Sequence, residues 1–211
     1  AEGILLTSWG DCGNHQPWAT LYPPLFLAAE LVWNGKKTND DIIGSAIDRE
    51  VFKKPNCRLG KAFIDLAKLD QIIGFNLPNN SLPWFALFSA QPEKLPRHLT
   101  EQTDLNNIRR GLVWLEELEQ KSFSINKDSL AHIAEQEWRL GIELSKIGIK
   151  YAKSLLDPKN IHSNMENCHA GLIKTFQEIW LLRARKGGLH EAVDLLEEAV
   201  KQTIKLSGIP L

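Results

Sequence analysis

The spacing of apolar residues predicts a short strand near the start of the chain and helices over most of the remainder. The first apolar run, residues 3–9, is rich in aliphatic residues and leads into a glycine-containing loop, which is the pattern of a buried strand. Two prolines precede the next apolar segment and an Asn-Gly pair follows it, as expected of a helix over about residues 25–33. We therefore expect residues 1–36 to form one strand–loop–helix unit.

After this unit the apolar positions recur with a period near 3.6 residues, which predicts an α-helical bundle. The stretch 77–96 contains four prolines and is expected to be an irregular connector that holds an apolar patch at residues 82–88. The fold class is therefore mainly α, with the N-terminal unit followed by a bundle of antiparallel helices. The expected helices of the bundle cover about residues 39–52, 59–75, 103–120, 126–156, 164–185 and 189–206.

The predicted strand has no equal elsewhere in the sequence, and this raises a question about its partners. A buried strand needs backbone hydrogen bonds on both sides. We expect the missing strands to come either from a second copy of the chain or from sequence outside it. The only methionine is Met165, so the chain reads either as a protein whose initiator was removed or as a piece of a longer one.

Composition excludes several classes of function. Lys and Arg total 25 against 26 for Asp and Glu, so neither nucleic acid nor an anionic membrane is expected as a partner. No apolar run is long enough to cross a bilayer, and no targeting peptide is visible. Cys12, Cys57 and Cys168 are too far apart to suggest a disulfide framework and fit a reducing compartment. We expect a cytoplasmic protein.

The loop after the predicted strand carries the densest chemistry. Trp9, Asp11, Asn14 and His15 place an indole, a carboxylate, an amide and an imidazole at the carboxyl end of that strand, where α/β barrels assemble their active sites. An indole face and a carboxylate acceptor suit a sugar, because the ring stacks on C–H surface and the carboxylate accepts hydroxyl protons. The alternative is structural, with Trp9 in the core and Asp11 capping the turn.

Two segments resemble glycoside hydrolase family 20. Residues 4–16, Ile-Leu-Leu-Thr-Ser-Trp-Gly-Asp-Cys-Gly-Asn-His-Gln, together with Tyr22-Pro-Pro-Leu at 22–25, resemble the last barrel strand, loop and helix of its β-N-acetylhexosaminidase branch. Residues 180–189, Trp-Leu-Leu-Arg-Ala-Arg-Lys-Gly-Gly-Leu, resemble the end of the same branch. The resemblance implies that residues 1–36 are the last βα unit of a (βα)8 barrel and residues 37–211 a C-terminal helical domain.

The resemblance also implies an activity: removal of a terminal N-acetylhexosamine with retention, assisted by the substrate's acetamide and without a cofactor. By motif position Trp9 would form part of the pocket wall and Asp11 would bind the outer hydroxyls, with Asn14 and His15 near enough to contribute. The family's catalytic Asp-Glu pair lies on the fourth strand, and this sequence contains no Asp-Glu dipeptide. We therefore expect no catalytic residue in this chain, no hydrolysis by the chain alone, and a barrel portion as partner.

Two other functions stay open at this stage. The chain could be a non-catalytic helical interaction protein that homodimerises through its strand, or one subunit of a split glycosidase. No metal is expected, because Cys12 with His15, or His162 with the Cys-His pair at 168–169, lacks the paired spacing of a zinc site.

Several charged and aromatic residues of the helices have expected structural roles. Glu137, which interrupts an apolar seam, is expected to be a partly buried ion-paired residue. The basic residues at 183–186 are expected to be solvated at a helix C-terminus. Four tryptophans are expected to form core or interhelix contacts: Trp84, Trp114, Trp138 and Trp180.

Overall fold

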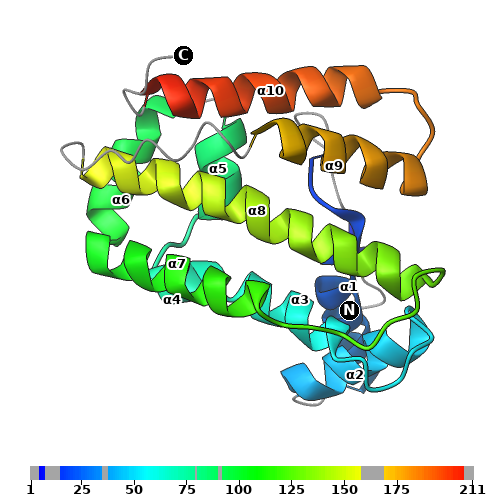
Figure 1. Cartoon of the computed structure of the whole chain (residues 1–211). Coiled ribbons are helices and arrows are strands. Elements are labelled where there is room, and N and C mark those ends of the chain that lie inside the picture. Colours follow the sequence, from blue (N-terminus) through cyan, green and yellow to red (C-terminus); the bar gives the residue numbers. More distant parts are fainter. Residues whose placement is uncertain are drawn as a thin grey trace.

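The fold is an α-helical bundle, seen in a computed structural model of the whole chain (Figure 1). The structure describes residues 5–7, 15–34, 38–78, 80–89, 92–157 and 169–206. Within these ranges the only β pairing is an isolated bridge between Leu77 and Asn80. The mainly α class expected from the sequence is confirmed.

The helices follow one another along the chain, joined by turns and loops of different lengths. A 3₁₀ turn, η2 (Trp18–Leu21), leads into α1, and another, η3 (Pro92–Lys94), precedes α6. The α-helices are α1 (Tyr22–Asn34), α2 (Asp40–Glu50), α3 (Leu59–Ala67), α4 (Leu69–Ile73), α5 (Leu82–Phe88), α6 (Leu95–Gln102), α7 (Leu105–Glu119), α8 (Leu130–Leu156), α9 (His169–Arg183) and α10 (Leu189–Leu206).

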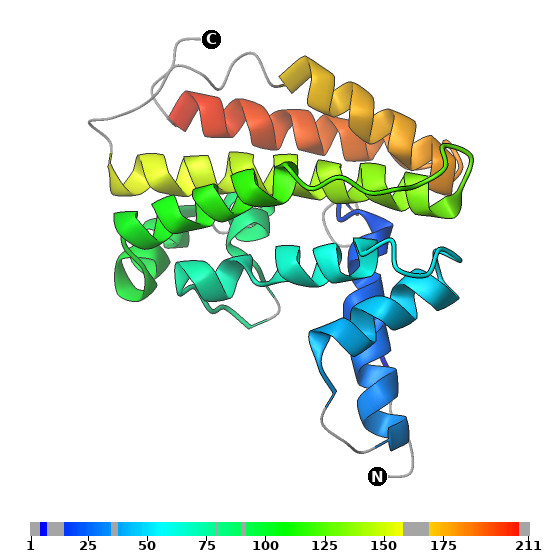
Figure 2. The same ribbon diagram turned by 60° about the horizontal axis from the view of Figure 1, so that its bottom comes forward.

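Helix α8 is the centre of the bundle. In both views α9 and α10 lie on one side of it, and α3, α4 and α7 lie on the other (Figures 1 and 2). One core cluster lies between α8 and the earlier helices and includes the fully buried Trp138. A second cluster joins α8 to α9 and α10 and includes Phe176 and Leu196. Because α8 supplies both cores, it is buried on more than one face.

Side-chain caps explain where several helices begin. Asn39, Asp104 and Ser129 each accept a hydrogen bond from the backbone N–H three residues later, at the starts of α2, α7 and α8. The caps of α2 and α7 lie where the sequence analysis expected helix starts. The cap of α8 does not, because the expected start near residue 126 leads first into a turn.

Two expected elements need correction. Residues 77–96 are not an irregular connector, because Ser81 caps α5 within them and α6 begins at Leu95. The helix expected over residues 59–75 is interrupted at Lys68, where the last turn of α3 tightens before α4 begins. The helix expected over residues 164–185 is present as α9, and the start expected at 164 lies outside the described residues.

The predicted strand lies mostly outside the described residues. Of residues 3–9, the structure describes Leu5, Leu6 and Thr7, and these make no strand pairing there. The side chain of Leu5 is 87% exposed. The strand of the N-terminal unit therefore stays a prediction, whereas its helix is present as α1.

Candidate functional site

The predicted sugar-binding residues fall at the edge of the described structure. Trp9, Asp11 and Asn14 lie outside the described residues, and His15 opens the described segment 15–34. His15 is 2% exposed, although it belongs to a segment with no regular secondary structure. The structure therefore locates one of the four candidates and places it in the interior.

His15 is held by three helices. Its Nε2 donates a hydrogen bond of 2.6 Å to the carbonyl oxygen of Ala192 on α10. Its ring stacks on Phe88, at the end of α5, with centroids 4.3 Å apart and planes 4° from parallel. The ring of Phe176 on α9 lies 5.6 Å away. The Nε2 atom of the imidazole is thus hydrogen-bonded to the protein backbone. The sequence analysis did not predict this partner or the two phenylalanines.

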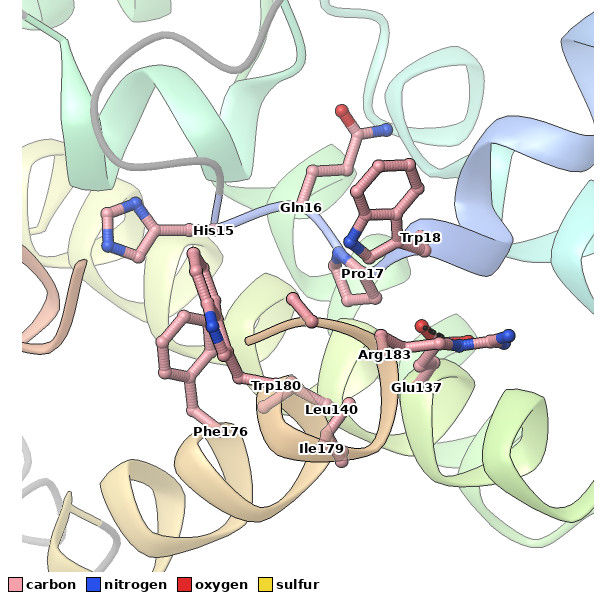
Figure 3. A pocket seen from close by; sticks show the side chains of 11 residues that line it. His15, Gln16, Pro17, Trp18, Glu137, Leu140, Phe176, Ile179, Trp180 and Arg183 are labelled. Carbon is pink, nitrogen blue, oxygen red and sulfur yellow. Dashed lines mark hydrogen bonds and ion pairs between the residues drawn. The ribbon is translucent and has the colours of Figure 1, made fainter. Parts of the chain in front are cut away.

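A hollow opens beside His15, where residues 15–18 cross α8 and α9 (Figure 3). The empty space there is about 320 Å³ with open solvent included, so the hollow is a shallow depression and not an enclosed cavity. The lining is mostly apolar and aromatic, with one acid and one base at its floor. The residues that line it are His15, Gln16, Pro17, Trp18, Glu137, Leu140, Phe176, Ile179, Trp180, Arg183 and Ala184.

The acid and the base in this hollow neutralise each other. Arg183 donates from Nη2 to Glu137 Oε2 at 2.6 Å and from Nε to Oε1 at 3.1 Å, which is a two-pronged ion pair. Burial acts to lower the pKa of Arg183, but the hydrogen bonds and charge of Glu137, with a contribution from Tyr22, outweigh it and raise that pKa. Removing either partner would leave a buried charge without compensation.

This pair settles two expectations from the sequence. Glu137 is ion-paired, as expected, but it is fully buried and not partly buried. The basic residues at 183–186 were expected to be solvated, and for Arg183 this is wrong. Its side chain is only 13% exposed and reaches back to α8. An acid inside an apolar seam signals a buried partner, but the sequence does not say which base supplies it.

Three of the four tryptophans belong to or pack against the core clusters, as expected: Trp114, Trp138 and Trp180. The ring of Trp84 instead lies near Phe88 of the same helix. Trp138 on α8 donates from Nε1 to the Ala62 carbonyl of α3 at 3.1 Å. Trp114 on α7 donates to the Asp65 carbonyl at the same distance. Trp180 on α9 donates to the Arg185 carbonyl at 2.9 Å, which closes the turn after α9.

Trp18 differs from these residues, because half of its side chain is exposed at the rim of the hollow (Figure 3). Next to Trp18, the hollow presents aromatic and apolar side chains that a ligand could stack on or contact. Its two charged groups, Glu137 and Arg183, are paired with each other.

The described cysteine, Cys57, is a buried residue of the core. Burial raises the pKa of the Cys57 thiol to about 11, with the neighbouring Asp48 adding to the effect, so this thiol is a weak nucleophile at neutral pH. Cys12 and Cys168 lie outside the described residues. In the described ranges no group of three or more His, Cys, Asp and Glu side chains is arranged to hold a metal ion. The helices described here include none long and apolar enough to cross a membrane.

Helix α1 exposes large apolar side chains on several of its sides. In Figure 2 it projects from the bundle, with α2 beside it. Apolar side chains occur all around this helix, which is typical of helices that are buried on every side. Pro23 is its one fully buried residue, and the tip residue Trp33 is 89% exposed. The large apolar side chains that α1 exposes are Leu25, Leu27, Leu31, Val32 and Trp33.

Comparisons with known proteins found no counterpart. No family model, no curated protein and no solved structure matches this chain. The class that the structure defines is a mainly α-helical bundle with an N-terminal segment anchored across its central helix. The sugar-related function is accordingly put forward below as a proposal.

Proposed function

We propose that this chain is the C-terminal portion of a retaining exo-β-N-acetylhexosaminidase that resembles glycoside hydrolase family 20. Residues 1–36 would complete a (βα)8 barrel, with Trp9 and Asp11 in the wall of the pocket for a terminal N-acetylhexosamine. The helical bundle would serve as the platform that carries this unit. The catalytic Asp-Glu pair would come from the barrel portion, so the chain alone would be inactive.

The observation that carries the proposal is the exposed apolar face of α1. Large exposed apolar side chains gathered on one helix usually mark a surface that another protein segment covers. The outer helices of a (βα)8 barrel bury one face on the strands and contact the neighbouring helices with their sides. A helix that is apolar all around fits this position, and α1 directly follows the segment whose motif resembles the last barrel strand.

The anchoring of residues 15–21 also supports the proposal. Ala19 is fully buried, Pro17 is buried, and the Thr20 backbone N–H donates to the Pro17 carbonyl at 3.0 Å. The chain therefore enters α1 from a fixed position on α8. A platform that holds the last βα unit against the rest of a barrel needs a rigid attachment of this kind.

The pocket assignment is tested by kinetics in the whole natural protein that contains this chain. Trp9→Ala and Asp11→Ala should each lower kcat/KM for an aryl N-acetyl-β-glucosaminide by about 1–3 kcal/mol, the cost of one stacking or buried polar contact. Glu117→Ala, an exposed acid on α7, is the control and should leave kcat/KM unchanged. Unchanged kinetics in both pocket variants would remove the sugar-site assignment.

The size of the native protein separates the remaining alternatives. Immunoblotting of source cells against the helical region, followed by mass spectrometry, should detect a species well above 23.9 kDa if the barrel belongs to the same chain. A species of 23.9 kDa that co-purifies with a barrel polypeptide would favour the split glycosidase. A 23.9 kDa homodimer without a glycosidase partner would favour the interaction protein and contradict the proposal.

A further inference from the structure

The hollow beside α9 presents two indoles that the surrounding structure holds in place. Trp18 belongs to η2 and Trp180 to α9, and Figure 3 shows them on either side of Pro17. The Trp180 ring is fixed by the hydrogen bond from its Nε1 to the Arg185 carbonyl. Trp18 is held because its two neighbours in the chain, Pro17 and Ala19, are both buried. A ligand in the hollow therefore meets aromatic surface that is already in position.

The charges at the floor of the hollow favour a neutral ligand. Glu137 and Arg183 are joined by two hydrogen bonds, of 2.6 and 3.1 Å, and both side chains are largely buried. An anion or a cation would have to compete with this pair for its partner. Breaking such a pair leaves the remaining charge buried and uncompensated, which is costly. A ligand without charge can bind beside the pair and leave it intact.

The openness of the hollow decides between two kinds of neutral ligand. Its empty space of about 320 Å³ includes open solvent, so a ring that lies in it keeps its outer edge in water. An apolar ring gains little there, because much of its surface stays hydrated. A pyranose ring suits the hollow better. Its C–H face can stack on an indole, while the hydroxyl groups at its edge keep their hydrogen bonds to water.

We propose that this hollow is a binding site for one neutral pyranose ring of a glycan, stacked on the half-exposed indole of Trp18. The inference goes beyond the proposed function, which places a sugar at Trp9 and Asp11. Every residue that lines the hollow belongs to the described part of the chain. The site therefore needs no residue from a barrel, and the chain by itself should bind the sugar.

NMR titration of the full chain tests the site. The probe is methyl β-D-glucopyranoside, a neutral sugar that lacks the acetamide of the proposed substrate. It should shift the indole N–H signals of Trp18 and Trp180, with a Kd on the order of 1–10 mM, as expected of a small ligand with few contacts. The signal of Trp33 is the reference and should not move, because Trp33 is 89% exposed on α1 and does not line the hollow.

Substitutions at Trp18 show whether its ring holds the sugar. Trp18→Ala should weaken binding about five-fold, the loss of one stacking contact, and Trp18→Phe should recover part of the affinity. Trp33→Ala is the matched control, an exposed tryptophan elsewhere, and should bind like the wild type. Trp18 belongs to neither core cluster, so the Trp18 variants should unfold near the wild-type Tm. The indole shifts of the wild type test the site without any substitution.

Three outcomes would overturn the inference. The first is the absence of indole shifts at about 100 mM glucoside, well above the expected Kd. The second is a stronger response of the same signals to N-acetylphenylalanine amide, which would make the hollow a site for an aromatic side chain of a protein. The third is loss of glucoside binding in Asp11→Ala but not in Trp18→Ala, which would assign the sugar to the predicted pocket and support the proposed function.

The inference and the proposed function can fail separately. If Trp9→Ala and Asp11→Ala leave the kinetics of the whole natural protein unchanged, the proposed function fails. Binding of the glucoside that depends on Trp18 would still establish the hollow as a sugar site.

Discussion

Buried acids in this protein have different properties because their partners differ. Glu137 faces a guanidinium and is neutralised by it. Asp65 is buried, and burial acts to raise its pKa. The hydrogen bonds and charges of Lys121 and Lys61 outweigh this effect and hold that pKa below its usual value. Asp70 accepts one hydrogen bond, from the Leu82 backbone N–H at 3.1 Å, and burial raises its pKa to about 6. The charge of ionised Asp70 therefore costs stability at neutral pH.

The raised pKa of Asp70 predicts a pH-dependent effect of its substitution. Because the folded state holds this proton more tightly than the unfolded state, the stability that Asp70 contributes is greatest below pH 4 and is lost as pH rises through about 6. Asp70→Asn can still accept from Leu82 but carries no charge. It should raise the free energy of unfolding at pH 8 by about 1–3 kcal/mol.

Urea unfolding at several pH values checks this prediction. The gain from Asp70→Asn should shrink as pH falls from 7 to 4, because the wild-type carboxyl becomes protonated in the folded state. Asp128→Asn, in an exposed turn, should change stability by less than about 0.5 kcal/mol. A gain of equal size at every pH would contradict the assigned cause.

At the scale of elements, α8 and α5 approach each other so closely that one position allows no side chain. A Cβ built on Gly148 of α8 would lie 2.7 Å from both the Cα and the carbonyl oxygen of Pro83 in α5. These are backbone atoms, which cannot rotate away as the end of a side chain can. Gly148 therefore sets the distance at which α5 packs on the central helix, and α5 carries Phe88, which holds His15.

We expect Gly148→Ala to destabilise the protein despite the higher helix propensity of alanine. Propensity would favour alanine by about 1 kcal/mol, but displacing α5 should cost more, for a net loss of about 1–3 kcal/mol. Gly171→Ala on α9 is the matched control, because no atom lies within 4 Å of its added Cβ. Thermal unfolding should give a lower Tm for Gly148→Ala alone, and equal Tm values for both variants would refute the packing argument.

The apolar pattern of the sequence predicted part of the buried surface of α8. The seam expected on the 126–156 helix includes Leu140, Leu144 and Ile147, and these residues do pack against α9 and α10. On its second buried face, Trp138 was expected to be a core or interhelix contact, whereas Ile142 and Ile149 were not part of the expected seam. A helix between two layers has apolar residues on opposite sides, and a search for one stripe finds only one of them.

At the scale of the whole molecule, the uncovered face of α1 predicts self-association of the isolated chain. Exposed apolar surface on a projecting helix should drive contacts between copies, with an average mass that rises with concentration. Leu31→Glu places a charge in this face and should shift the chain towards monomer in sedimentation velocity. Val113→Glu, at an exposed apolar position of α7, is the matched control and should associate like the wild type.

Other outcomes of this measurement are equally informative. A chain that stays monomeric at every concentration would contradict the interpretation that α1 needs a cover. A dimer of constant stoichiometry that is lost in Leu31→Glu would point to a second copy as the occupant, which is the alternative of a homodimeric interaction protein.

Sequence alone determined the features that depend on neighbours along the chain. The helical class, the caps at Asn39 and Asp104 and the bounds of α10 follow from periodicity and local hydrogen bonding, which act over a few residues. It also predicted that Glu137 needs a partner, because a charge in an apolar seam must be compensated.

Only the tertiary structure decided which distant groups meet. It paired Glu137 with Arg183 and joined His15 to Ala192, and neither follows from local pattern. The physical reason is the same in each case. The free energy of a buried ion pair, an interior hydrogen bond or an apolar contact depends on which surfaces the packing of whole helices brings together.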